Sequence, residues 1–301
     1  MARTSIHTLD LNFQGRQQAI ASYMLEHSDG VALVETGPGS TLEALRAALK
    51  THGYGFQHVT HVFLTHIHLD HAGASGYLAS QGAQIHVHPQ GAAHLLNPEK
   101  LIASATRIYG ELMEPLWGQF LPVPAEKLTI LQDEEEVAVG GLRIRALNTP
   151  GHAEHHYAYL LEDACFTGDV GAVRIPGFQY LRLPMPPPEL NLEKWRETVA
   201  RLQKLSLKRI APTHFGVFDD ADWHLGSILA RLDEVENWLN QNLPANLPID
   251  ELKRNFLAWM ERQAHAQGLT PETIEAYRLA NPLEISVDGL SRYWKKFRIQ
   301  R

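Results

Sequence analysis

The feature that most constrains this chain is a short run of ligand-type side chains, His66-x-His68-x-Asp70-His71. Three imidazoles and a carboxylate within six positions are too dense for an ordinary packed core, because each buried polar group needs a partner. Metal ions are the most economical partners for such groups. In an extended segment His66 and His68 point to the same side, whereas Asp70 and His71 turn away where a helix begins. One loop can therefore supply ligands to two adjacent ions.

Composition limits both the ligands and the partners. Cys165 is the only cysteine, so a metal must be held by imidazole and carboxylate groups, and this lone thiol is expected to be a small buried hydrophobe. The formal net charge is −7, which gives no general attraction to nucleic acid. We therefore expect no nucleic-acid partner.

No segment approaches the roughly 20 apolar residues of a membrane span, and the first residues do not resemble a signal peptide. We expect a cytoplasmic protein without a membrane partner. The sequence does not indicate an oligomeric state.

The hydrophobic pattern predicts strands alternating with helices up to residue 216 and helices alone beyond it. Strands are predicted at 22–25, 30–34, 58–64, 85–88, 127–131, 136–147, 156–168 and 209–211, and helices at 42–49, 100–117 and 191–205. Thr270-Pro271 marks the start of a later helix, with proline at its first position. The prediction is a catalytic domain over residues 1–216 and a C-terminal helical region, residues 217–301, packed on it.

Three further motifs lie at the ends of predicted strands. They are Thr149-Pro150-Gly151-His152, Phe166-Thr167-Gly168-Asp169 and Pro212-Thr213-His214. Together with the first run, and in this order, they resemble the metallo-β-lactamase superfamily over residues 1–216. The resemblance implies an α/β (α+β) fold, the four-layer αββα metallo-β-lactamase sandwich, with an added C-terminal helical region.

The same resemblance implies a dinuclear metal centre. One ion would be bound by His66, His68 and His152, the other by Asp70, His71 and His214, and Asp169 would bridge them. Asp70 would also orient the attacking hydroxide and handle its proton. Glu35 stands where the superfamily usually has aspartate, and we interpret it as a support for the ligands. We expect two divalent ions per chain; zinc is favoured because five of the seven ligands are imidazoles, and iron or manganese would also fit.

The predicted activity is hydrolysis of a small or medium carboxylic ester, thioester or lactone through a metal-bound hydroxide. The Thr-Pro-Gly-His and Thr-Gly-Asp turns resemble those of glyoxalase II-like hydrolases, and lactonases of the superfamily are close in chemistry. We expect a small-molecule acyl substrate with one anchored anion. The candidate substrate-binding residues are Arg174, Phe178 and Tyr180 after Asp169, and Arg107 and Tyr109 on the predicted helix 100–117.

Two other activities are compatible with the same motifs and fold. A phosphodiesterase or RNA-processing nuclease would share the His-x-His-x-Asp-His loop, although the negative net charge disfavours a polyanionic substrate. A mononuclear iron dioxygenase would use the same sandwich. A β-lactamase role is disfavoured because such enzymes are typically exported, and no signal peptide is recognised here.

Overall fold

The computed structural model describes residues 3–245 and 247–299, and the chain divides into two compact units. The first unit comprises residues 1–148 and 155–168, and the second comprises residues 149–154 and 169–301. The predicted division between residues 216 and 217 is a different partition and stays a prediction. The chain passes from one unit to the other three times, after Asn148, Glu154 and Gly168.

The first unit contains a mixed sheet in the order β1-β2-β3-β4-β5-β6. Its strands are β1 (His7–Asp10), β2 (Ala21–His27), β3 (Gly30–Val34), β4 (Val59–Phe63), β5 (Gln84–Val87) and β6 (Leu128–Ile130). Strands β1 to β3 are antiparallel, and β3 to β6 run parallel to one another. The carboxyl ends of β3 and β4 therefore lie at the same edge of the sheet, where Glu35 and the His66 loop follow.

A second, antiparallel set of strands belongs to the same unit. It consists of β7 (Glu136–Val139), β8 (Leu142–Asn148), β9 (Tyr157–Leu161) and β10 (Ala164–Phe166), in the order β10-β9-β8-β7. Its apolar face packs on the first sheet: the Phe63 and Tyr159 rings lie 5.3 Å apart, as do those of Tyr23 and Phe166. The Tyr159 hydroxyl donates to the Leu64 carbonyl at 2.9 Å, so this buried phenol is satisfied.

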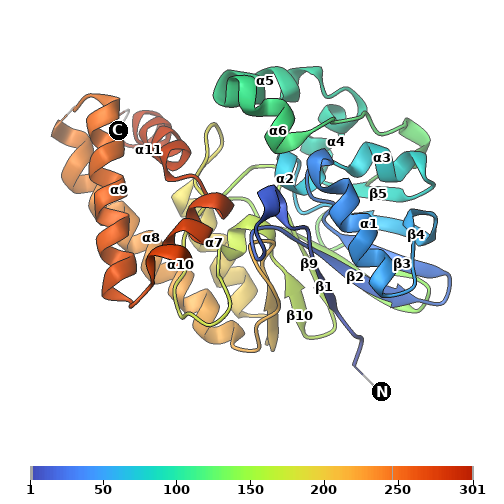
Figure 1. The fold of residues 1–301 in the computed structure, drawn as a ribbon. Coiled ribbons are helices and arrows are strands. Elements are labelled where there is room, and N and C mark those ends of the chain that lie inside the picture. Colours follow the sequence, from blue (N-terminus) through green and yellow to red (C-terminus); the bar gives the residue numbers. More distant parts are fainter. Residues whose placement is uncertain (1–2, 246, 300–301) are drawn as a thin grey trace. The chain divides into compact units, whose positions relative to one another are not determined.

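The helices of this unit follow the strands of the mixed sheet (Figure 1). They are α1 (Leu42–Thr51), α2 (Leu69–Ala72), α3 (Ser75–Ser80), α4 (Pro89–Leu96), α5 (Glu99–Tyr109) and α6 (Met113–Trp117). Helix α1 buries Leu45 and Leu49, the residues whose spacing predicted it. The predicted helix over 100–117 is interrupted because Gly110 adopts φ 52°, which ends α5.

The second unit is mainly helical. Its elements are α7 (Leu192–Gln203), β11 (Arg209–Ala211), α8 (Ala221–Asn242), α9 (Ile249–Ala266), α10 (Pro271–Ala280) and α11 (Leu283–Phe297), and Figure 1 shows the last four in orange and red. The predicted start of α10 is confirmed, since the Thr270 side chain accepts from the Thr273 N–H and Pro271 is the first helical residue. Within the described residues, no helix is long and apolar enough to cross a bilayer.

The C-terminal helices pack on residues that precede position 216. The Tyr277 hydroxyl of α10 accepts from the Ile175 N–H at 3.0 Å and donates to the Tyr180 carbonyl at 2.8 Å. Asn281 donates to the Leu183 carbonyl at 3.0 Å. Helices after residue 217 therefore form one unit with the loop that follows Asp169.

Candidate metal centre

In the first unit, the loop after β4 gathers the predicted ligands. His66 Nε2 lies 2.9 Å from His68 Nδ1, and the rings of His66 and His71 lie 4.0 Å apart. Helix α2 begins at Leu69, so Asp70 and His71 lie in its first turn, as the sequence predicted. Asp70 Oδ2 is 3.5 Å from His71 Nε2. The loop thus concentrates four potential ligand side chains, of which His66 and His71 are buried.

Glu35 orients this loop from the end of β3. It is fully buried and adopts φ 70°, a left-handed conformation that is costly for a residue with a side chain. Its carboxylate accepts from the Thr65 hydroxyl and backbone N–H, and from His71 Nδ1 at 2.9 Å. With its proton at Nδ1, His71 carries its lone pair at Nε2, the atom that can bind a metal. Glu35 therefore has the contacts of a positioning residue, although its oxygens are also close enough to His66 and His71 to bind an ion with them.

Two further histidines line the loop. His156 stacks on His66 with ring centroids 5.0 Å apart, and His155 lies edge-on to His68 at 5.6 Å. Both follow shortly after the Thr-Pro-Gly-His motif, and this position is the sequence feature that indicates a role near the metal centre. Gly168 is explained by the same crowding, since a Cβ there would lie 2.5 Å from the Thr65 hydroxyl and 2.8 Å from His156 Nε2. The glycine of the Thr-Gly-Asp turn is thus required by a close approach.

Tyr109 lies near the candidate centre, whereas Arg107 is exposed at the end of α5. Burial and the neighbouring Asp70 carboxylate hold the pKa of Tyr109 well above its usual range. Its ring packs edge-on against Trp117 at 5.0 Å. Tyr109 therefore remains a protonated donor near Asp70, and its predicted contact with substrate stays a prediction.

In the second unit, two predicted histidine ligands converge on the carboxylate of a third predicted ligand, Asp169. His152 Nε2 lies 3.2 Å from Asp169 Oδ2, and His214 Nε2 lies 3.3 Å from Asp169 Oδ1. All three residues are buried. Each carboxylate oxygen therefore faces a different imidazole, which is the arrangement of a carboxylate that can bridge two ions.

The local fold fixes His152. Its Nδ1 donates to the Pro184 carbonyl at 2.8 Å, which leaves the lone pair on the Nε2 that faces Asp169. Gly151 adopts φ +145°, and a Cβ there would come within 2.5 Å of the Trp195 Cα. The Trp195 indole donates to the Val170 carbonyl at 2.9 Å, next to Asp169. The Thr-Pro-Gly-His motif is thus fitted against α7.

Arg174 is held by protein groups. Its guanidinium donates twice to Asp220, at 2.6 and 2.8 Å, and lies 4.0 Å from the Phe218 ring centroid and 4.5 Å from that of Trp223. The Arg174 hydrogen bond is the main reason why the pKa of Asp220 lies below its usual value. These contacts favour a structural role for Arg174, and its predicted role in substrate binding stays a prediction.

Phe178 and Tyr180 belong to an apolar cluster. Tyr180 is buried with Val173, Ile175 and Tyr277, and Phe178 packs on the same cluster while partly exposed. Their predicted contact with substrate also stays a prediction. Cys165 is fully buried, and burial raises the pKa of its thiol to about 12, so its expected inertness agrees with its surroundings.

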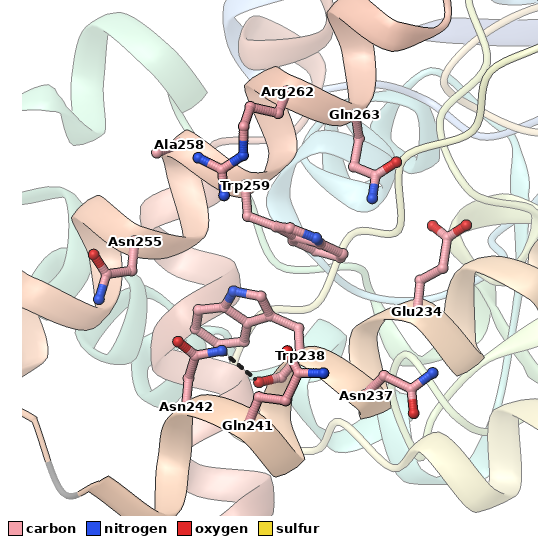
Figure 2. A pocket seen from close by; sticks show the side chains of 10 residues that line it. All are labelled: Glu234, Asn237, Trp238, Gln241, Asn242, Asn255, Ala258, Trp259, Arg262 and Gln263. Carbon is pink, nitrogen blue, oxygen red and sulfur yellow. Dashed lines mark hydrogen bonds between the residues drawn. The ribbon is translucent and has the colours of Figure 1, made fainter.

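A separate hollow of about 460 Å³ lies between α8 and α9 (Figure 2). Figure 2 shows the indoles of Trp238 and Trp259 surrounded by side-chain amides and by Glu234 and Arg262. The lining contains none of the predicted ligands or substrate residues. This hollow is therefore a feature of the helical region and not of the candidate metal centre.

A sequence profile of the metallo-beta-lactamase superfamily matches residues 15–214. The chain belongs to this superfamily. It is accordingly a metal-dependent hydrolase, and its fold is the metallo-β-lactamase αββα sandwich with C-terminal helices, as predicted from the four motifs.

Three relatives are similar over different lengths. The chain is 29% identical over 182 residues to the metallo-beta-lactamase fold-containing protein ST1585 of Sulfurisphaera tokodaii, covering 58% of this chain and 68% of that protein. It is 26% identical over 285 residues to an atrochrysone carboxyl ACP thioesterase of Aspergillus fumigatus, covering 94% and 75%. It is 32% identical over 156 residues to the lactamase-like protein adaB of Aspergillus niger, covering 50% of this chain and only 39% of that relative.

The crystal structure of ST1585 from Sulfolobus tokodaii superposes on this chain with a TM-score of 0.64 at 21% identity, covering 96% of this chain and 99% of that one. At this identity the likeness concerns the fold alone. It extends over almost the whole chain, so the helices after residue 216 are included in the comparison.

Proposed function

We propose that the chain is a dinuclear metal hydrolase that cleaves a small or medium carboxylic ester, thioester or lactone. In this proposal His66, His68 and His152 hold one ion, Asp70, His71 and His214 hold the other, and Asp169 bridges them. The observation that carries it is the geometry of Asp169, whose two oxygens face His152 and His214 separately. Each oxygen can then bind a different ion together with the imidazole that faces it.

The covalent connection between Gly168 and Asp169 supports a shared site for the ligands of the His66 loop and those around Asp169. Asp169 is linked by one peptide bond to Gly168, and consecutive Cα atoms are about 3.8 Å apart. Gly168 is itself packed against Thr65, the neighbour of His66. The bridging carboxylate is therefore attached directly to a residue whose place beside the first ligand loop is fixed.

The donor set fits a borderline divalent ion. Five imidazoles and two carboxylates suit zinc, iron or manganese better than magnesium, which prefers oxygen ligands, and zinc is our choice. Ions bound there would lower the pKa of water toward about 7 and polarise a substrate carbonyl. The contact of Glu35 with His71 and that of the Pro184 carbonyl with His152 fix the tautomers that such binding requires.

The chain's own residues then handle the proton and the oxyanion. Water adds to the carbonyl carbon, and the bond to the leaving alcohol or thiol breaks. Asp70 accepts the proton of the attacking water and returns it to the leaving group. Tyr109, protonated beside Asp70, donates a hydrogen bond to the carbonyl oxygen as negative charge develops on it. A thioester is a reasonable first substrate, because one relative that matches most of this chain is a thioesterase.

The test combines metal content with activity. Asp169→Ala and His68→Ala should lose bound metal, and hydrolysis of generic esters and thioesters should fall by more than about 100-fold, the upper range for changes outside the ligand shell. His265→Ala, at an exposed histidine near the end of α9, is the matched control and should change neither. Full metal content with retained activity in either ligand variant would sink the dinuclear proposal.

Metal analysis also separates the alternatives. About two zinc ions per chain supports the proposal, whereas a single iron with oxygen-dependent turnover would favour the dioxygenase. Faster turnover of RNA or a cyclic phosphodiester than of any ester, thioester or lactone would contradict the proposed acyl substrate and identify the chain as a phosphodiesterase or nuclease. Each result assigns the chain to a different reaction of the same fold.

A further inference from the structure

A second group of possible metal ligands lies in the first unit, away from the His66 loop. His7 Nε2 is 3.5 Å from Glu26 Oε1, and the rings of His7 and His52 are 4.6 Å apart. One ligand atom from each of the three residues lies within 4.8 Å of the others. None of them belongs to a motif of the superfamily noted above.

The sheet register explains why these side chains meet. His7 pairs with Met24 across the antiparallel β1–β2 ladder, so both point to the same face, and Glu26 follows two residues later on that face. The opposite face carries Tyr23, which packs on Phe166 of the second sheet. His52 is the residue directly after α1, a helix that contacts β1. Three elements therefore bring one side chain each to the same place.

This group lies at the other end of the sheet from the candidate metal centre. Glu26 pairs with Val31 near the start of β3, and Val31 pairs with Val59 at the start of β4. The ligand loops follow the opposite ends of these strands, after Val34 and Phe63. A change at His7, Glu26 or His52 should therefore leave the hydrolytic site intact.

We propose that His7, Glu26 and His52 form an additional zinc site. Two imidazoles and one carboxylate are a three-ligand set that zinc accepts, with water in the fourth position. The side chains of His7 and Glu26 are 29% and 48% exposed, so they can shift by the small amounts needed and exchange the ion with solvent. Bound zinc would tie the edge strand β1 to β2 and α1, and so stabilise the N-terminal part of the sheet.

The test counts zinc on the full chain by equilibrium dialysis and elemental analysis. Wild type should bind one zinc more than His52→Ala and one more than Glu26→Gln, a variant that keeps the side-chain shape. Zinc should also raise the thermal midpoint of the wild type more than that of either variant. Ester hydrolysis should be equal in all three proteins.

His265→Ala is the control, because it removes an exposed histidine elsewhere. Equal zinc binding by wild type, His52→Ala and Glu26→Gln would overturn the site. Loss of the same zinc in His265→Ala would also overturn it, since the ion would then be bound adventitiously by surface histidines. The outcome is independent of the proposed hydrolase mechanism, which concerns other residues.

Discussion

At the scale of single residues, Arg174 is paired with a carboxylate that lies far from it in the chain. His152 and His214 follow strand ends in short motifs, and the structure brings both to Asp169. Arg174 also follows Asp169 closely, which suggested a pocket wall. Its partner Asp220 is 46 residues away, and a pairing over that distance leaves no periodicity or motif in the sequence.

Arg174→Ala should therefore act mainly on stability. It removes a two-point ion pair and two aromatic contacts, and we expect a loss of about 2 kcal/mol, below the 3–5 for a fully buried pair because Asp220 is 37% exposed. Urea denaturation measures the change, with exposed Arg143→Ala as control. A rise in KM for an anionic ester but not for a neutral one, without loss of stability, would restore Arg174 to substrate binding.

His86 offers a prediction on pH. Its buried ring stacks on Phe63 at 4.5 Å, and neither ring nitrogen has a hydrogen-bond partner among the described residues. Burial, with a smaller effect of His61, lowers the pKa of His86 to about 3. The unfolded chain therefore binds one more proton than the folded chain between about pH 3 and 6.5, so stability falls as the pH drops through this window.

His86→Phe should retain the stacking and remove this proton uptake. We expect equal or greater stability at pH 7, and a dependence of unfolding free energy on pH that is flatter by up to about 1.4 kcal/mol per pH unit between pH 4 and 6. Denaturant titrations at several pH values measure the slope. An unchanged slope would mean that His86 is protonated in the folded protein.

At the scale of elements, the sequence predicted most strands of both sheets because their apolar runs end in clear turns. The segments 136–147 and 156–168 each form a hairpin, with the turns at Gly140-Gly141 and Glu162-Asp163, residue pairs that are typical of turns. Strand β1 was missed, since three of its four residues are polar and it lies at a sheet edge. The break between α5 and α6 was also missed, because Gly110 can be accommodated in a helix or end one.

At the scale of the whole molecule, the two compact units do not follow the order of the chain. Residues 149–154 belong with 169–301, so the His152 motif is part of the unit that contains the C-terminal helices. The hydrophobic pattern along the sequence predicted a domain boundary where the alternation of strands and helices stops, near residue 216. The division into two compact units depends on contacts between segments that are far apart in the sequence, and hydrophobic periodicity contains no information on such contacts.

The C-terminal helices should consequently be required for activity. Tyr277 and Asn281 hold the backbone of residues 175–183, and the next residue, Pro184, accepts the hydrogen bond that orients His152. In addition, a Cβ at Gly289 of α11 would lie 2.0 Å from the Met185 carbonyl, so this helix packs directly on the same loop. Without these helices the loop loses its backbone partners, and His152 loses its fixed orientation.

Limited proteolysis of the full chain tests this dependence. We expect no stable, fully active fragment ending near Gly216, because cleavage there would separate the loop from α10 and α11. Tyr277→Phe is a milder test of the same contact between α10 and the loop. It removes the hydroxyl that accepts from the Ile175 N–H and donates to the Tyr180 carbonyl, and it should lower the free energy of unfolding by about 1–3 kcal/mol. Tyr54→Phe, at a half-buried ring next to His58, is the control. A fragment of residues 1–216 with unchanged turnover and substrate preference would contradict the requirement, since the helices would then contribute nothing to the position of His152.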